Sequence, residues 1–278
     1  MNKYGHFLFL MAVMLVLQLQ VGDDRQNPDE LLNSLFATVN AQDTMDQEQP
    51  FQPEPDESVF LSVYSPEEAA ELTANPESPF WRDVTGITFD RRINTGEVVP
   101  ALHTDVRSRW TDTHLYFMFV CSYEEANLRP NPVTDVQTNQ LWNHDVMEVY
   151  IGANFVDITK YYELQVSPQG EYLDMKIDQT LPGIGRGDEW LWDSGWEVKA
   201  RHNPEDRVWY GEFRLPIASI DERSAQTGNE FRINLYRLQG PHPGRGEGLR
   251  DFIAWQPTFE YHPHRPQYFG RLKLVEKP

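Results

Sequence analysis

From Val59 to the C-terminus the sequence is a succession of short β-type runs separated by turn residues, and this pattern constrains the fold more than any other feature. Apolar and polar residues alternate within many of the runs, which is typical of strands that bury one face. We expect strands at residues 87–90, 103–110, 115–123, 146–153, 161–166, 172–177, 196–201, 208–215, 231–238, 252–255 and 269–275. The only brief helical pattern that we identify is residues 66–72.

Short turns between these runs predict antiparallel hairpins. Residues 111–113 separate Trp110 from Leu115, and residues 167–170 separate Val166 from Tyr172. No helices intervene to make parallel crossovers, so we predict an all-β domain at residues 59–278, an antiparallel β-sandwich of two packed sheets of the immunoglobulin or jelly-roll type. Eight Trp residues supply apolar surface for such a core.

The N-terminal part predicts export. Lys3 precedes an unbroken apolar run from Phe7 to Leu17, so residues 1–21 are interpreted as a signal peptide or signal anchor. An uncleaved anchor stays an alternative because the better cleavage pattern, residues 39–41, lies far downstream. Residues 22–58 are rich in acidic side chains and contain four prolines, which is typical of an extended linker. We therefore expect an extracytoplasmic protein, secreted or periplasmic.

The net charge of -19 argues against a nucleic-acid partner or an anionic membrane, which are bound by clustered Lys and Arg. The linker carries about half of this charge, so we do not interpret the acidity as a binding surface. A neutral ligand fits better. The single cysteine, Cys121, follows an apolar run and is expected to be a buried small hydrophobe.

Three runs, residues 146–151, 161–166 and 231–236, place polar side chains on the face opposite their apolar one. In the first run Met147, Val149 and Ile151 share one face, and Glu148 interrupts the other. If the three runs share one sheet, the non-core face of that sheet carries Glu148, Glu163, Gln165, Arg232, Asn234 and Tyr236.

These residue types suit sugars. Carboxylates, amides and guanidinium groups bond vicinal hydroxyls, and an aromatic ring covers the apolar C–H face of a sugar. Trp142 stands just before the strand of Glu148 and supplies the ring. The alternative is that Glu148 forms an ion pair with Arg232 on a solvated face while Trp142 covers a strand edge.

The order of several motifs resembles family 9 carbohydrate-binding modules, whose sandwich is of the kind found in DOMON domains. The resemblance spans about Trp81 to Val275. It rests on residues 110–116, the Trp142-x-x-Asp145-x-x-Glu148 block, Tyr162-Glu163, Gly211-Glu212 before Leu215-Pro216, Phe231-Arg232-Ile233-Asn234, Ala254-Trp255 and Phe269-Gly270-Arg271-Leu272.

The resemblance implies that Trp142 and Glu148 contact a terminal sugar and that Asn234 lies in a strand of polar contacts. Family members clamp the sugar with a second Trp before the Phe-Gly, where this chain has Tyr261-His262-Pro263-His264. Tyr261 and His264 are therefore the candidates for the second wall. Gln165 stands near the place of a family Arg. A structural calcium ion is also implied, with ligands that the sequence does not assign.

The expected function is non-catalytic binding of plant-type polysaccharides or oligosaccharides, such as xylan or cellulose-like glucans, in carbohydrate catabolism. The candidate ligand contacts are Trp142, Glu148, Gln165, Arg232, Asn234, Tyr236, Tyr261 and His264. We expect a monomer that acts alone or with cell-surface or enzyme partners, including as an accessory protein of a glycoside hydrolase.

Two alternatives from other classes remain. The first is a haem-binding periplasmic electron-transfer sandwich of the DOMON type, with axial ligands drawn from Met118, Met147, Met175 and the histidines. The second is an adhesion or assembly sandwich without a small ligand.

Weaker patterns favour ordinary structural roles. His262 and His264 could begin a zinc site, but no third ligand is evident and solvated loop histidines are favoured. The glycines at 183–187 and 244–248 fit loops better than phosphate sites. Glu148 and Glu163 could be imagined as a glycosidase pair. Trp190, Trp192 and Trp196 are interpreted as core or loop anchors, with a ligand platform as the alternative.

Overall fold

The computed structural model describes residues 58–181, 192–240 and 250–276. The signal segment 1–21, the linker up to residue 57, Trp190 and both glycine clusters lie outside the described residues. Within the three described ranges no helix has the length and hydrophobicity of a membrane span.

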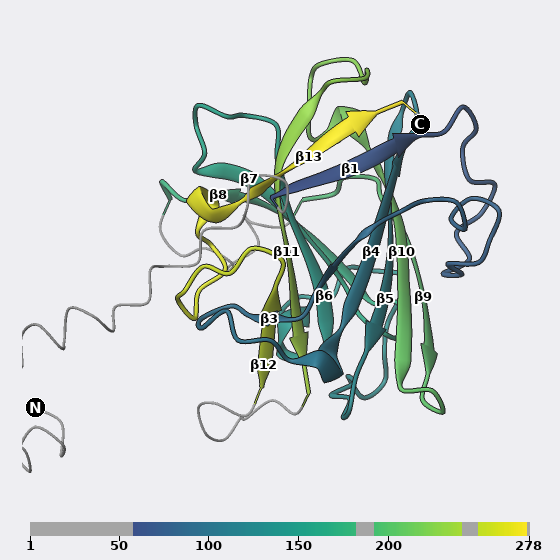
Figure 1. Ribbon diagram of the computed structural model, residues 1–278, viewed down its shortest axis with the longest axis vertical. Helices are drawn as coiled ribbons and strands as arrows, with labels where there is room; N and C mark the ends of the chain where they lie inside the picture. Colours follow the sequence, from purple (N-terminus) through teal and green to yellow (C-terminus); the bar gives the residue numbers. More distant parts are fainter. Residues whose placement is uncertain (1–57, 182–191, 241–249, 277–278) are drawn as a thin grey trace, which may run out of the picture. The chain divides into compact units, whose positions relative to one another are not determined.

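Thirteen strands and four short 3-10 helices make up the described part of the domain (Figure 1). The strands are β1 (Val59–Tyr64), β2 (Ile87–Phe89), β3 (Arg91–Arg92), β4 (Thr104–Trp110), β5 (His114–Ser122), β6 (Val146–Gly152), β7 (Lys160–Val166), β8 (Tyr172–Asp178), β9 (Glu197–Asn203), β10 (Val208–Pro216), β11 (Glu230–Gln239), β12 (Asp251–Ala254) and β13 (Gly270–Val275). The 3-10 helices are η1 (Pro100–Leu102), η2 (Leu141–Asn143), η4 (Ile217–Ser219) and η5 (Pro266–Tyr268).

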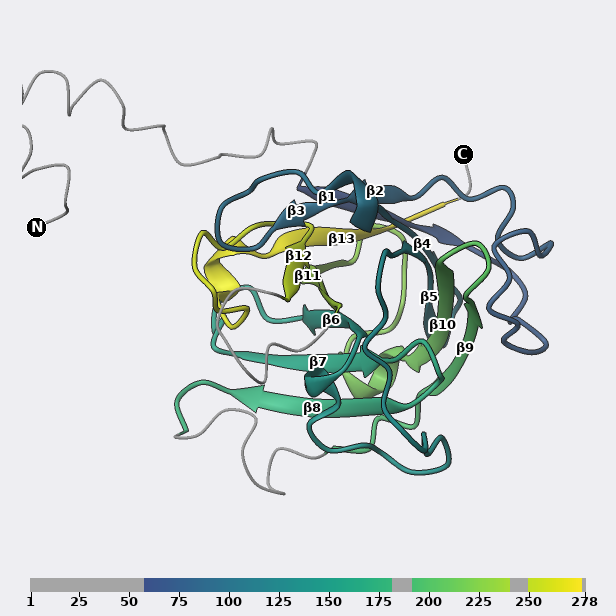
Figure 2. The same ribbon diagram turned by 90° about the horizontal axis from the view of Figure 1, so that it is seen from below.

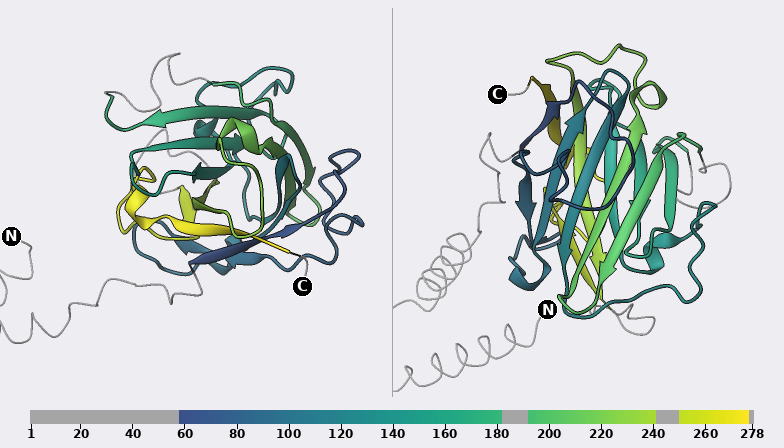
Figure 3. Two further views of the ribbon diagram at one scale, coloured as in Figure 1. Left: turned by 90° about the horizontal axis from the view of Figure 1, so that it is seen from above. Right: turned by 90° about the vertical axis from the view of Figure 1, so that its right-hand side faces the viewer.

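The strands join into one hydrogen-bonded sheet in the order β8-β7-β6-β11-β13-β1-β4-β5-β10-β9. In addition β12 pairs with β11 and β3, and β2 pairs with β4. The sheet curls until it is nearly closed, so β8, β7 and β6 face β1 and β13 across the core (Figures 2 and 3). The all-β prediction is confirmed, whereas the described strands form a continuous curled sheet in place of the two separate sheets that we expected.

β1 is responsible for this continuity. It runs parallel to β13 over five residue pairs, from Val59 beside Arg271 to Val63 beside Val275 (Figure 1). It also runs parallel to β4, where Val63 lies beside Arg109. The sequence pattern did not predict β1, and the expectation of a purely antiparallel fold was therefore wrong. The long connection from Ser65 to His103 supplies the crossover that parallel neighbours require.

The eleven predicted strands are present within one or two residues of their expected bounds. Both predicted hairpins form, with Trp110 opposite Leu115 and Val166 opposite Tyr172. The two-residue strand β3 was too short to show a pattern. Residues 66–72 contain no helix: they are bends and irregular chain, held by contacts with the sheet.

The central core lies inside the curl and contains apolar side chains from both halves of the sheet. Met147, Val149 and Ile151 point into it as the alternation predicts. Cys121 is fully buried there, and burial raises the pKa of its thiol to about 12. Trp196 also belongs to this core, while Trp192 packs at its margin against Tyr162.

A strap formed by residues 65–86 crosses the outer face of β4, β5 and β10. Trp81 packs with Tyr116 and Met118 under this strap. Glu212 of β10, itself buried, accepts hydrogen bonds from the Trp81 indole at 2.6 Å and from the backbone N–H groups of Thr73 and Ala74 at 2.7 and 2.6 Å. One carboxylate thus fixes the strap at three points.

We expect Glu212→Ala to lower the free energy of unfolding by about 3 kcal/mol, because three donors, two of them buried, lose their acceptor. Urea unfolding followed by fluorescence measures the change. The matched control is Glu197→Ala, which removes an exposed pair with Arg214 and should cost at most about 1 kcal/mol. Equal effects of the two substitutions would contradict the anchoring role of Glu212.

Candidate functional site

The polar residues of the three runs do share one face of one sheet. Strands β11, β6 and β7 are neighbours, and their register sets two rows of side chains across the face. The rows are Tyr236, Glu148 and Gln165 in one and Asn234, Tyr150 and Glu163 in the next. Because residues two apart along a strand point to the same side, the two rows are adjacent on that face.

This face is buried. Glu148 is 1% exposed, Glu163 is 2% exposed, and Gln165 is fully enclosed. A second hydrophobic cluster covers the same face, with Leu173, Met175 and Ile177 contributed by β8. The sheet therefore presents carboxyl and amide groups in surroundings of low polarity, where unpaired polar atoms are costly.

Gln165 lies between the two carboxyl groups and bonds both. Its Nε2 donates to Oε1 of Glu148 at 3.0 Å and to Oε1 of Glu163 at 2.5 Å. The remaining atoms of the three groups, Oε2 of Glu148, Oε2 of Glu163 and Oε1 of Gln165, are buried without a hydrogen bond of normal geometry from the described chain, although the Tyr150 hydroxyl lies close enough to lower the pKa of both carboxyl groups. We refer to Glu148, Glu163 and Gln165 as the acceptor trio.

Burial controls the protonation of the trio. It raises the pKa of Glu163 to about 7, with opposing contributions from the hydrogen bond of Gln165 and from Tyr150. Burial and then the neighbouring charge of Glu163 raise the pKa of Glu148 well above its usual value, and Arg250 opposes this. Both shifts favour the protonated form, so the pair holds less negative charge than two exposed carboxylates.

The connection between β12 and β13 lies over this face. The Tyr236 hydroxyl donates to the carbonyl of Pro263 at 2.9 Å, and the Tyr161 hydroxyl lies 2.8 Å from Nδ1 of His264. Gln179 donates to the carbonyl of His264 at 2.9 Å. These bonds place the imidazole next to Glu163, with 3.8 Å between Nε2 and Oε2. Burial lowers the pKa of His264 to about 3, so the ring is neutral.

Trp142 and Tyr261 lie at the margin of the site. Trp142 is half-buried, packs against the second cluster and accepts a hydrogen bond at its carbonyl from Arg250 at 2.6 Å. Tyr261 is 60% exposed, and its ring meets Phe252 edge-on at 5.8 Å. Of the two candidates for a second aromatic wall, His264 contacts the buried rows and Tyr261 lies at the rim.

Arg232 and Asn234 are occupied by the protein itself. Arg232 donates to the carbonyls of Asn154 and Lys160 at 2.7 and 3.3 Å, close to the backbone of Gly152. It therefore holds the β6–β7 turn, and the alternative ion pair with Glu148 is wrong. Asn234 bonds the Tyr236 hydroxyl and both the carbonyl and the N–H of Gln256, so its amide anchors the β12–β13 connection.

Sequence reasoning missed three residues of the site. Alternation along the strands puts Tyr150 on the face of Glu148 and Tyr161 on the face of Glu163, where the two rings stack at 5.8 Å, but neither was predicted to be a ligand contact. Arg250 reaches the site from beyond the strands. Its guanidinium donates to the carbonyls of Trp142 and His144, and no periodic pattern indicates such contacts.

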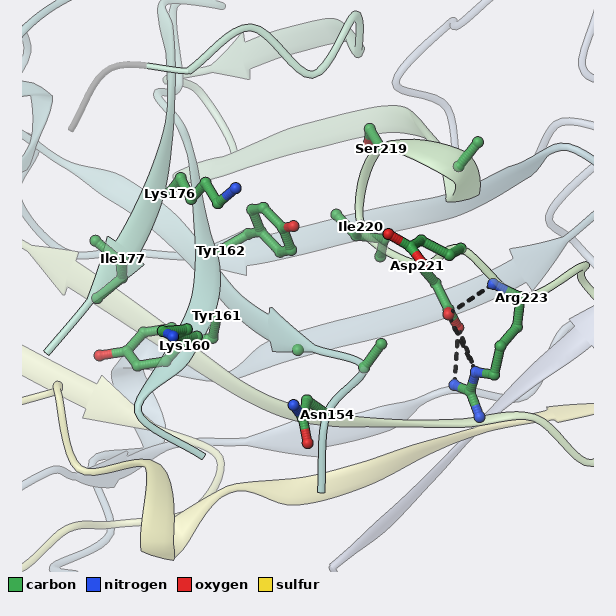
Figure 4. Close-up of a pocket in the computed structure, with 14 residues that line it drawn as sticks. Asn154, Lys160, Tyr161, Tyr162, Lys176, Ile177, Ser219, Ile220, Asp221 and Arg223 are labelled. Atoms are coloured by element: carbon green, nitrogen blue, oxygen red, sulfur yellow. Dashed lines mark hydrogen bonds and ion pairs between the residues drawn. The ribbon is translucent and has the colours of Figure 1, made fainter. Parts of the chain in front are cut away.

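A separate cavity of about 560 Å³ opens between β7, β8 and the turn around η4 (Figure 4). Tyr162, Lys176 and Ile220 line it. Its charged groups are largely paired within the protein: Arg223 bonds Asp221, and Lys160 lies 3.3 Å from Asp157. This cavity contains none of the residues predicted to bind a ligand.

The structure disfavours the haem alternative. Met147 is in the central core, Met118 is under the strap, and Met175 belongs to the second cluster. The three thioethers thus lie in three different packed regions. Among the described residues no group of three or more His, Cys, Asp or Glu side chains is arranged to hold a metal ion, so the paired histidines 262 and 264 have no third ligand there.

No protein-family model matches the chain, and no curated protein matches it. Among solved structures it is similar to a protein from Bacteroides uniformis ATCC 8492 to which carbohydrate binding is attributed. The TM-score is 0.58 at 13% identity, over 78% of this chain and 98% of that one. This likeness establishes a shared fold.

Two structures of a family 9 carbohydrate-binding module from Caldicellulosiruptor kristjanssonii also match. The structure with glucose aligns at TM-score 0.49 and 15% identity over 79% of this chain and 97% of the module. The structure with cellotriose aligns at 0.49 and 13% over 79% and 95%.

The raised pKa of Glu163 predicts that stability falls with rising pH. The carboxyl group ionises freely in the unfolded chain near its usual pKa of 4.5 and only near 7 in the folded chain. The contribution of Glu163 to the free energy of unfolding is therefore fully present below pH 4.5 and is lost as the pH rises through about 7. The titratable groups facing it are Glu148, Tyr150, Tyr161, Tyr236 and His264, while the charge of Arg250 acts on Glu148.

Glu163→Gln should raise the free energy of unfolding at pH 8 by on the order of 2 kcal/mol relative to its effect at pH 4.5. Denaturant titrations at both pH values measure this difference. Glu222→Gln, at an exposed glutamate, is the control and should leave the pH dependence unchanged. A Glu163→Gln variant with the same pH profile as the parent would show that Glu163 ionises normally.

Proposed function

We propose that the protein is an exported, non-catalytic carbohydrate-binding module that takes plant-type β-glucans or xylan fragments in extracytoplasmic carbohydrate catabolism. The observation that carries the proposal is the acceptor trio, with three unpaired oxygen atoms on one sheet face beside the half-buried ring of Trp142. Sugar hydroxyls supply the missing donors, and the indole covers an apolar sugar face. The likeness in fold to a protein with attributed carbohydrate binding supports the same reading.

The protonation of the trio suits a hydroxyl ligand. Burial favours a protonated carboxyl group in the pair, which offers both a donor and an acceptor, and the Gln165 carbonyl offers one more acceptor. A sugar hydroxyl both donates and accepts. Mixed groups of this kind can therefore bond adjacent hydroxyls without burying a net charge on the ligand.

The arrangement of the carboxyl groups favours binding over hydrolysis. A glycosidase places its acid and its nucleophile or base on either side of the scissile bond. Glu148 and Glu163 instead project from one face of adjacent strands and are linked by a single amide nitrogen. We propose that the pair contacts the same side of a sugar.

Titration of the full chain with cello- or xylo-oligosaccharides should quench tryptophan fluorescence, and Trp142→Ala should abolish the response. Trp192→Ala is the matched control, since it removes another half-buried indole that packs against Tyr162 away from the trio. It should leave the affinity unchanged. If no sugar of a broad glycan array binds, the proposal is wrong.

A further inference from the structure

The acceptor trio has more acceptors than the surrounding chain has donors. Both hydrogens of the Gln165 amide are used by the two carboxyl groups. The Tyr236 hydroxyl is directed to Pro263, and the Tyr161 hydroxyl faces His264. Three buried oxygen atoms remain, two from glutamates and one from an amide, and the Tyr150 hydroxyl beside both carboxyl groups has one hydrogen to give, so at least two of the three need a donor from outside the chain.

The trio also lacks a compensating positive charge. No Lys or Arg nitrogen of the described chain lies within 4.0 Å of either carboxyl group. Arg250 directs its terminal nitrogens to the carbonyls of Trp142 and His144, and Arg232 directs its own to the β6–β7 turn. The one basic group close to Glu163 is His264, whose burial keeps it neutral.

A primary ammonium group satisfies both requirements. It brings three N–H donors, enough for the acceptors that remain, and one positive charge. A hydroxyl brings one donor and no charge. Buried carboxylates repay the desolvation of a cation when they bond it directly, and the rings of Tyr150 and Tyr161 can add cation–π attraction.

We propose that the acceptor trio selects an amino sugar, with the ammonium group of a β-linked 2-amino-2-deoxy sugar bonded by Glu148, Glu163 and Gln165. This inference rests on the proposed carbohydrate-binding function and specifies the class of sugar. The bound ammonium supplies the positive charge that an arginine side chain would supply if the protein itself balanced the carboxylates.

Three β-1,4-linked oligomers of equal length provide a matched test, because they differ only at C2: glucosamine carries an amine, N-acetylglucosamine an acetamide and glucose a hydroxyl. Isothermal titration of the full chain should give at least tenfold tighter binding of the glucosamine oligomer than of the other two. At pH 5.5, where the free amine is already protonated, titrations in two buffers of different ionisation enthalpy should show net proton release with glucosamine and none with glucose, since the ammonium favours the ionised carboxylates.

Glu163→Gln should reduce the preference for the glucosamine oligomer over the glucose oligomer to within about twofold, and Glu222→Gln should retain it. Circular dichroism and an unfolding curve establish that each variant is folded. If the glucose oligomer binds as tightly as the glucosamine oligomer, the amino-sugar inference is overturned while carbohydrate binding stands. If none of the three oligomers or any other glycan binds, the proposed function fails with it.

Discussion

Burial of β6, β7 and β11 on both faces is the constraint on which the rest of the structure depends. One face forms the central core, and the other is covered by the second hydrophobic cluster and the β12–β13 connection. Each polar group on the covered face must then find a partner inside the domain or in a ligand. Asn234 and Tyr236 find partners in the connection, whereas Glu148 and Glu163 share one amide and keep unpaired oxygens. Some polar groups of this face thus hold the fold together, and the others are left to bond a ligand.

The β12–β13 connection, which covers this face, is also part of the segment that closes the sheet. It leads directly into β13, whose first residue, Gly270, passes close to the ring of Trp255 and the carbonyl of Ser58. A Cβ atom at Gly270 would lie 2.6 Å from that carbonyl, so only glycine permits the approach. The Phe269-Gly270 motif is therefore a requirement of the closure, and the position of His264 over the site follows from where the connection ends.

Alternation along strands was enough to predict the all-β fold and the shared face, because side chains two apart must point the same way. It placed Glu148, Gln165 and Tyr236 on the face that the structure brings together. It could not show that this face is covered, since the cover comes from an irregular connection without period. For the same reason alternation does not indicate Arg250. It also does not show that the side-chain donors of Arg232 and Asn234 are bonded to backbone carbonyls of the protein itself. β1 escaped prediction because its burial alternates weakly and its partners are distant in sequence.

The parallel pairing of β1 with β13 determines when the domain can be completed during synthesis. Val59 pairs with Arg271, more than 200 residues later, so this contact carries a large loop-closure entropy. Until residues 270–275 leave the ribosome, β1 can pair only with β4, over two residues. The nascent chain consequently carries an unpaired strand edge through nearly the whole of its translation, and that edge is where a chaperone would bind or a second nascent chain would add.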